Sequence, residues 1–96
     1  MNDKTLLELA AKAAGYEIEI LTNYVFWNPL TDDGDALRLA VKLNIRVLEC
    51  GKRAAIATFK QLGITISEKI IEDPYAATRR AITRAAAAIA EQGEKE

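Results

Sequence analysis

The stretch WNPLTDDGDALRLAV, Trp27 to Val41, holds an aromatic residue, a proline, a glycine and three aspartates directly before an apolar run. This order is typical of a helix start. Leu30 precedes the cap, Thr31 or Asp32 supplies the N-cap oxygen, and the acids that follow face the positive end of the helix dipole. We predict a helix that continues through residues 36–43. Because apolar side chains cover most of its circumference, we expect it to be the most buried element.

The aspartates of this stretch, Asp32, Asp33 and Asp35, are also a candidate cation site, because clustered carboxylates suit Ca²⁺ or Mg²⁺. Their D-D-G-D spacing does not place ligands on alternate residues, as a calcium loop does. Helix capping explains the same residues without an ion, so we expect no metal and no cofactor. Trp27 is a candidate stacking or partner-binding residue, although a lone tryptophan more often anchors a loop against the core.

Composition excludes several classes of function. The chain has 96 residues, a net charge of −1, one cysteine and no histidine. Without histidine, the Ser-His-Asp and Cys-His mechanisms and ordinary zinc sites are not available. The single cysteine, Cys50, cannot form an internal disulfide, and we interpret it as a packing residue or an incidental thiol. We therefore expect a protein that is not an enzyme.

The chain carries no signal for export or membrane insertion. No apolar run approaches the roughly 20 residues of a membrane span, and the N-terminus has no signal-peptide pattern. We expect one compact domain over residues 1–96, with a frayed tail at 93–96, that is cytoplasmic and makes no membrane contact.

Two further helices are predicted. Residues 3–14 begin at Asp3 as N-cap, end at Gly15, and place four apolar residues on one face, namely Leu6, Leu9, Ala10 and Ala13. Asp73-Pro74 starts the last helix, with Asp73 as N-cap and Pro74 in the first helical position. This helix runs to about Gln92, and its predicted inward stripe is Tyr75, Thr78, Ile82, Ala85, Ala86 and Ile89.

Strands are predicted between these helices. Residues 16–20, YEIEI, alternate strictly, and we expect them to form a hairpin with residues 24–27. Residues 45–49 and 64–69 are rich in β-branched side chains and predict two more strands. Gly51-Lys52 is a candidate tight turn. The alanine-rich segment between these strands, residues 53–62, fits a strand or a helix equally well on pattern alone.

Three blocks, LLELAAKAAG, WNPL-x-DDGDALRLAVKL and DPYAATRRAI, cover most of the chain. With them the chain resembles the phage α/β/α sandwich domain family, which comprises small phage- and prophage-encoded proteins without an assigned activity. The resemblance implies a strand hairpin between the last two blocks, which favours a strand at residues 53–59. The expected fold is then α+β, in the order α-ββ-α-ββ(β)-α, with an antiparallel sheet of about four to five strands packed against three helices.

Arginines provide the remaining candidate site. Arg80 and Arg84 are one turn apart on the last helix, and together with Arg79 they are candidates to bind a phosphate or the carboxylates of a partner. Charge is otherwise spread along the chain, and residues 45–72, with five basic and three acidic groups, reach only +2. That is weaker than the basic footprint of a dedicated duplex binder. Arginines on a solvated helix face are the simpler interpretation.

These observations favour a small phage or prophage accessory protein that binds a host protein, a phage protein or a second copy of itself. Besides Arg80 and Arg84, the candidate contact residues are Glu17 and Glu19, which share one face of a predicted strand. The alternative is a nucleic-acid-binding protein that uses Arg79, Arg80 and Arg84 with Lys52 and Arg53. Its affinity would fall steeply with added salt. An enzyme that uses the aspartates with a divalent metal is the weakest hypothesis.

Overall fold

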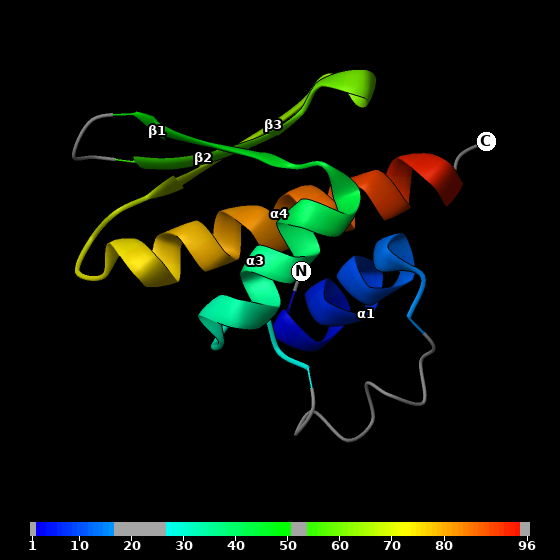
Figure 1. The fold of residues 1–96 in the computed structure, drawn as a ribbon, viewed down its shortest axis with the longest axis horizontal. Coiled ribbons are helices and arrows are strands. Elements are labelled where there is room, and N and C mark those ends of the chain that lie inside the picture. The colour runs from blue at the N-terminus through cyan, green and yellow to red at the C-terminus, as the bar shows by residue number, and fades with distance from the viewer. Residues whose placement is uncertain (1, 17–26, 51–53, 95–96) are drawn as a thin grey trace.

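The computed structural model describes residues 2–16, 27–50 and 54–94. Within them the protein is α+β, with three helices and one antiparallel sheet of three strands (Figure 1). In chain order the elements are α1 (Asp3–Ala14), α3 (Asp33–Leu43), β1 (Arg46–Cys50), β2 (Ala54–Phe59), the short 3₁₀ helix η1 (Lys60–Leu62), β3 (Ile64–Lys69) and α4 (Pro74–Glu94).

The long helix α4 organises the molecule. It runs between the sheet on one side and α1 on the other, and α3 packs across it next to α1 (Figure 1). Its sheet contacts are mainly with β2 and β3, so that β1 extends beyond the part of the sheet that α4 covers. In the part of the chain that the structure describes, no helix is long and apolar enough to cross a membrane.

The strands pair in the order β1-β2-β3, with Val47 opposite Ala57 and Ala57 opposite Ile66. The strand predictions for residues 45–49, 53–59 and 64–69 are confirmed to within one residue at each end. Four to five strands are not confirmed. The predicted hairpin of residues 16–20 and 24–27 and the turn at Gly51-Lys52 fall mainly on residues 17–26 and 51–53, outside the described residues.

Alanine is a poor strand former, yet the central strand β2 begins with two of them. Ala55 and Ala57 are buried on the face of the sheet that α4 covers. Their small side chains allow a close approach of helix and strand, while β1 and β3 satisfy the β2 backbone on both sides. Tertiary pairing therefore outweighs intrinsic propensity in this strand.

The start of α1 differs from the prediction by one residue. The N-cap is Asn2 rather than Asp3, because Asn2 Oδ1 accepts a hydrogen bond of 2.8 Å from the Thr5 amide. Gly15 ends the helix as predicted, with a positive φ of 80° that suits glycine. The buried face is rotated slightly from the predicted one, since Leu9 and Ala13 are only half-buried; its members are Leu6, Leu7, Ala10, Ala11 and Ala14.

The start of α3 is confirmed and its predicted burial is wrong. Asp32 is the N-cap and accepts a hydrogen bond of 2.7 Å from the Asp35 amide. Only Ala36, Leu39 and Ala40 of this helix are buried. Because α3 packs against α4 and only slightly against α1, one stripe is covered and the rest of its apolar surface faces outward.

The start of α4 is also as predicted. Asp73 Oδ1 accepts a hydrogen bond of 2.9 Å from the Tyr75 amide, and Pro74 is the first helical residue. The helix ends at Glu94, beyond the expected Gln92, and takes in the beginning of the expected tail. Ile82, Ala85 and Ala86 are buried, whereas Tyr75 is 69% exposed, so its place in the inward stripe is wrong. Tyr75 lies in the first turn, at the rim of a surface hollow.

Candidate functional site

Large apolar side chains gather around a groove formed by α3, β1 and α4. Leu37 is 64% exposed and Tyr75 69%, and Val47 on β1 is nearly half exposed. The groove has a volume of about 510 Å³ and reaches down to the buried Ile82. We call it the α3–β1–α4 groove; it is lined by Ala36, Leu37, Val47, Tyr75, Thr78 and Ile82, with Asp33 and Arg79 at its rim.

The apolar surface continues beyond this groove in two directions. Val41, one turn from Leu37 on α3, is 71% exposed. A second hollow of about 420 Å³ shares Val47, Tyr75 and Thr78 with the groove and extends it to Leu48, which is also nearly half exposed. The two hollows therefore form one continuous apolar surface along β1.

The rim of the groove is held by Arg79. Its side chain is mostly buried, donates from Nε to the Leu30 carbonyl at 2.9 Å, and pairs with Asp33 at 2.7 Å. These contacts fasten α4 to the start of α3. Arg79, one of the three candidate arginines, thus binds a carbonyl and a carboxylate of its own chain.

The aspartate cluster is explained by local contacts. Asp32 caps α3, Asp33 binds Arg79, and Asp35 accepts from the Asn28 amide at 2.9 Å and from Arg38 at 2.7 Å. The hydrogen bond that Arg38 donates to Asp35 also raises the pKa of Arg38. Among the residues that the structure describes, no group of three or more acidic or cysteine side chains is arranged to hold a metal ion.

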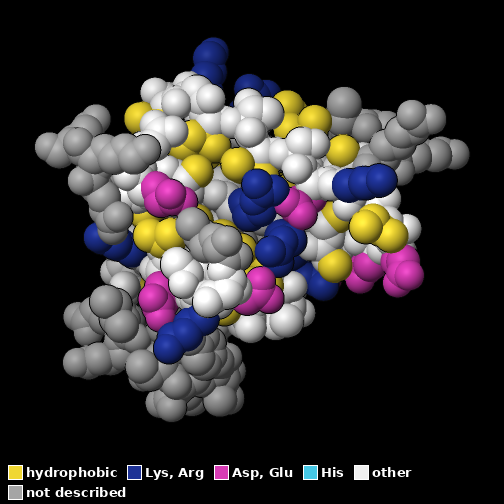
Figure 2. All heavy atoms as spheres, turned by 180° about the vertical axis from the view of Figure 1, so that it is seen from behind, with side chains coloured by type: hydrophobic (Ala, Val, Ile, Leu, Met, Phe, Trp, Pro, Cys, Tyr) yellow, Lys and Arg dark blue, Asp and Glu magenta, His cyan; other side chains and the backbone are white. Residues whose placement is uncertain are grey.

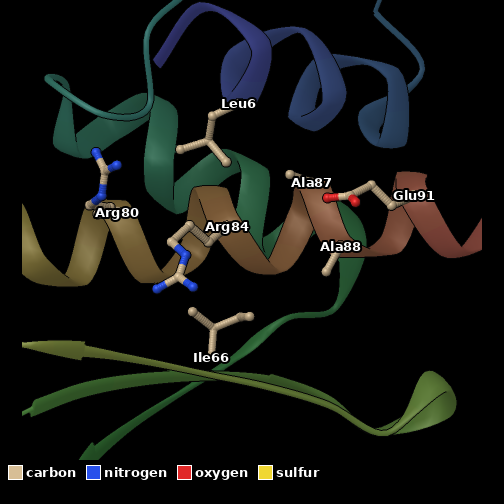
Figure 3. A pocket seen from close by; sticks show the side chains of 7 residues that line it. All are labelled: Leu6, Ile66, Arg80, Arg84, Ala87, Ala88 and Glu91. Carbon is tan, nitrogen blue, oxygen red and sulfur yellow. The ribbon is translucent and has the colours of Figure 1, made fainter. Parts of the chain in front are cut away.

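The other two candidate arginines lie on the opposite side of α4. Arg80 and Arg84 both bind Glu68 of β3, with 3.6 Å between Arg80 Nε and Glu68 Oε1, and Arg80 also pairs with Asp3 at 3.1 Å. Figure 3 shows both arginines beside a small hollow of about 260 Å³, whose other walls include Leu6, Ile66, Ala87, Ala88 and Glu91. Because the acids nearby balance both cations, this cluster carries no excess positive charge.

On the face seen in Figure 2, the dark blue basic side chains near the centre lie beside magenta acidic ones, whereas those at the upper edge have no acidic neighbour in view. Two cations differ from the paired arginines. Arg46 at the start of β1 and Lys60 in η1 line a hollow with Asn44 and Gln61, and neither forms an ion pair with another described residue. One end of β1 is therefore cationic.

Trp27 lies in the core, only 7% exposed, with its ring edge-on to Tyr16 at a centroid distance of 5.4 Å. Lys42 Nζ in turn lies 4.5 Å from the Tyr16 ring centroid. Burial leaves little of the indole for a base or a partner, which matches the anchoring role. Its Nε1 has no hydrogen-bond acceptor among the described atoms.

Four candidate residues lie outside the described residues, namely Glu17, Glu19, Lys52 and Arg53. Cys50 is the last residue of β1. The spacing of the groove residues Leu37 and Tyr75, by contrast, predicts that they lie in the core. The one signal in the sequence was the width of the apolar surface of residues 36–43, which exceeds what a single packing contact covers.

Comparisons with protein-family models, with curated proteins and with solved structures found no match to this chain.

Proposed function

We propose that the protein is a non-enzymatic protein-interaction module and that the α3–β1–α4 groove is its binding surface. The observation that carries the proposal is the concentration of exposed Leu37, Val47 and Tyr75 around one groove, with the exposed Val41 one turn from Leu37. Single exposed apolar residues are ordinary, but a contiguous group of them on a small protein marks a contact surface.

The chemistry of the groove suits a protein partner. Tyrosine is enriched at interfaces because its large ring loses little conformational entropy and its hydroxyl can stay hydrated. The exposed Tyr75 and the buried Ile82 line the same groove, and the polar residues Asp33 and Arg79 line it beside them, so that an apolar centre lies next to charged groups. Such an arrangement is typical of binding sites for proteins.

The resemblance of the WNPL and DPY blocks to phage proteins supplies the biological setting of this proposal. The protein then acts in the cytoplasm of a bacterial host on a host or phage protein. Nucleic-acid binding through Arg79, Arg80 and Arg84 has less support, because each guanidinium is already bound to a carboxylate of the chain.

A nuclease-treated pull-down tests the proposal. The tagged protein and its Leu37→Asp variant are incubated with lysate of phage-infected bacteria, and retained proteins are compared. We expect the wild type to retain a protein that Leu37→Asp loses, because a charge in the groove opposes burial. Ile71→Asp is the matched control, since Ile71 is 80% exposed and does not line the groove.

Circular dichroism and urea unfolding of all three proteins show whether each is folded. Equal retention by wild type and Leu37→Asp would rule out the groove as the binding surface. Material that disappears from the wild type on nuclease treatment would instead favour the nucleic-acid alternative. That alternative also predicts a steep fall of binding with added salt, which the same pull-down can measure.

A further inference from the structure

The outer edge of β1 carries two exposed apolar side chains. Within the described sheet β1 has a neighbour on one side only, and no described strand pairs with its other backbone edge. Natural edge strands are usually protected by charged side chains, especially lysine, by proline or by a covering element. β1 has the sequence RVLEC, without proline or lysine; between its charged residues Arg46 and Glu49, Val47 and Leu48 are both nearly half exposed.

The opposite edge strand, β3, is protected in these ways. Its sequence ITISEK alternates polar residues with apolar ones and ends in Lys69, and its Glu68 is held by Arg80 and Arg84. An added strand would therefore find apolar side chains to pack on at β1 and mainly polar ones at β3. The sheet offers one favourable edge.

We infer that β1 binds an extended segment of a partner protein, which adds to the sheet as an antiparallel strand and carries the motif apolar-apolar-acidic toward its carboxyl end. This inference rests on the proposed function, whose groove it fills. Strand addition is a common mode of peptide recognition, in which backbone hydrogen bonds provide affinity and side-chain pockets provide specificity.

The register of the sheet gives the motif. Val47 pairs with Ala57, whose side chain is buried against α4, so a residue opposite Val47 points toward the same face and into the α3–β1–α4 groove. Leu48 pairs with Ile56 on the outer face, where a second apolar residue would lie beside it. These two positions account for the apolar pair.

Charge gives the third position of the motif. A strand antiparallel to β1 reaches Arg46 after it has passed Leu48 and Val47. Its residue opposite Arg46 lies on the same outer face, within reach of the guanidinium. Arg46 and Lys60 form no ion pair among the residues described, so an acidic side chain there gains a partner without breaking an existing contact.

Selection from a displayed random peptide library, with the whole protein as bait, tests the inference. We expect enrichment of apolar-apolar-acidic sequences that bind wild type and lose affinity for Leu37→Asp. Replacing the acid by lysine should weaken binding to wild type by about two- to fivefold, the scale of an exposed ion pair. Binding of that lysine peptide should recover with Arg46→Glu, whereas Lys69→Glu on β3, the matched control, leaves the acidic peptide's affinity unchanged.

A scan of N-methylated peptides tests the strand geometry. Methylation removes one amide N–H at a time, and only alternate N–H groups of an added strand face β1. We expect sensitive and tolerant positions to alternate. Loss of affinity at spacings of three and four residues, or an enriched motif without an acid, would overturn the inference.

Two further outcomes would also overturn it, namely the absence of any enriched peptide, or a wild-type dimer in sedimentation that Leu48→Asp converts to a monomer. The second would assign the edge to another copy of this chain. In every one of these cases the proposed function still stands or falls by the Leu37→Asp pull-down, so the two failures are distinguishable.

Discussion

The two sides of α4 differ in how completely they are covered. On one side, alanines of α1 and α4 meet closely, and Glu68 of β3 binds Arg80 and Arg84 across the helix. On the other side, α3 and β1 stand apart and leave Leu37, Val47 and Tyr75 exposed. One helix can therefore supply both the stability of a small domain and the wall of an open groove.

The difference follows from side-chain size and from which strands of the sheet α4 contacts. Helices α1 and α4 can approach closely because four fully buried residues between them have small side chains, namely Ala10, Ala11, Ala85 and Ala86. β1 lies beyond the strands on which α4 mainly packs. Apolar residues on α3 and β1 thus point toward a space that the described chain leaves open.

The largest expected effect separates two neighbouring leucines of α3. Leu39 is fully buried and Leu37 is mostly exposed. Leu39→Ala should lower the free energy of unfolding by about 2 to 5 kcal/mol, because it removes buried methyl groups and leaves a cavity. Leu37→Ala should change it by less than about 0.5 kcal/mol. Urea unfolding of both variants measures the difference, and equal losses would contradict the assignment of Leu37 to a binding surface.

The next effect concerns the closed side. Ala85→Leu adds bulk to a fully buried position in α4 and should cost about 1 to 3 kcal/mol. For a domain of this size, each kcal/mol lowers Tm by about 4 to 8 °C. Ala88→Leu is the control, because Ala88 borders a hollow that can take the larger side chain (Figure 3). A smaller fall in Tm for Ala85→Leu than for Ala88→Leu would show that the helices are not closely packed there.

The helix start beside the groove should contribute less. Asp32→Ala removes the N-cap oxygen of α3 and should cost about 0.5 to 2 kcal/mol. Asp33→Ala breaks only an ion pair whose carboxylate is exposed, so we expect a loss below about 1 kcal/mol. Thermal unfolding with and without added Ca²⁺ checks both variants. A Tm of the wild type that rises with Ca²⁺ would return the aspartates to consideration as a cation site.

The smallest expected effect is that of the charge cluster. Glu68→Gln weakens two ion pairs, and since both arginines are partly exposed, we expect a loss of about 1 kcal/mol or less. Salt screens such pairs, so the difference between variant and wild type should shrink as the salt concentration rises. Urea unfolding at low and high salt measures this. A difference that is independent of salt would mean that Glu68 acts through packing.

Local signals in the sequence predicted the ends of most elements. Asp32, Asp73-Pro74 and Gly15 lie at the helix ends they predict, because capping depends on a few adjacent residues. β3 was predicted by its β-branched residues. β2 required the family resemblance, because alanine takes its conformation from the strands and helix around it.

The candidate site could not be predicted in the same way, because it depends on contacts between distant residues. Arg80 finds its partners in Asp3 and Glu68, which are far from it in the sequence, so its spacing from Arg84 said nothing about their pairing. Leu37 and Tyr75 have the periodicity of core residues. Whether a helix is covered on one side or on two is decided by the packing of the whole chain.

The central claim is that the open side of α4 binds a protein and the closed side holds the fold together. Amide chemical shifts in a ¹⁵N NMR spectrum, recorded as the captured protein or the selected peptide is added, test it most directly. We predict the largest changes at Leu37, Val47 and Tyr75. Changes centred instead on Glu68, Arg80 and Arg84, with the groove residues unaffected, would contradict the claim.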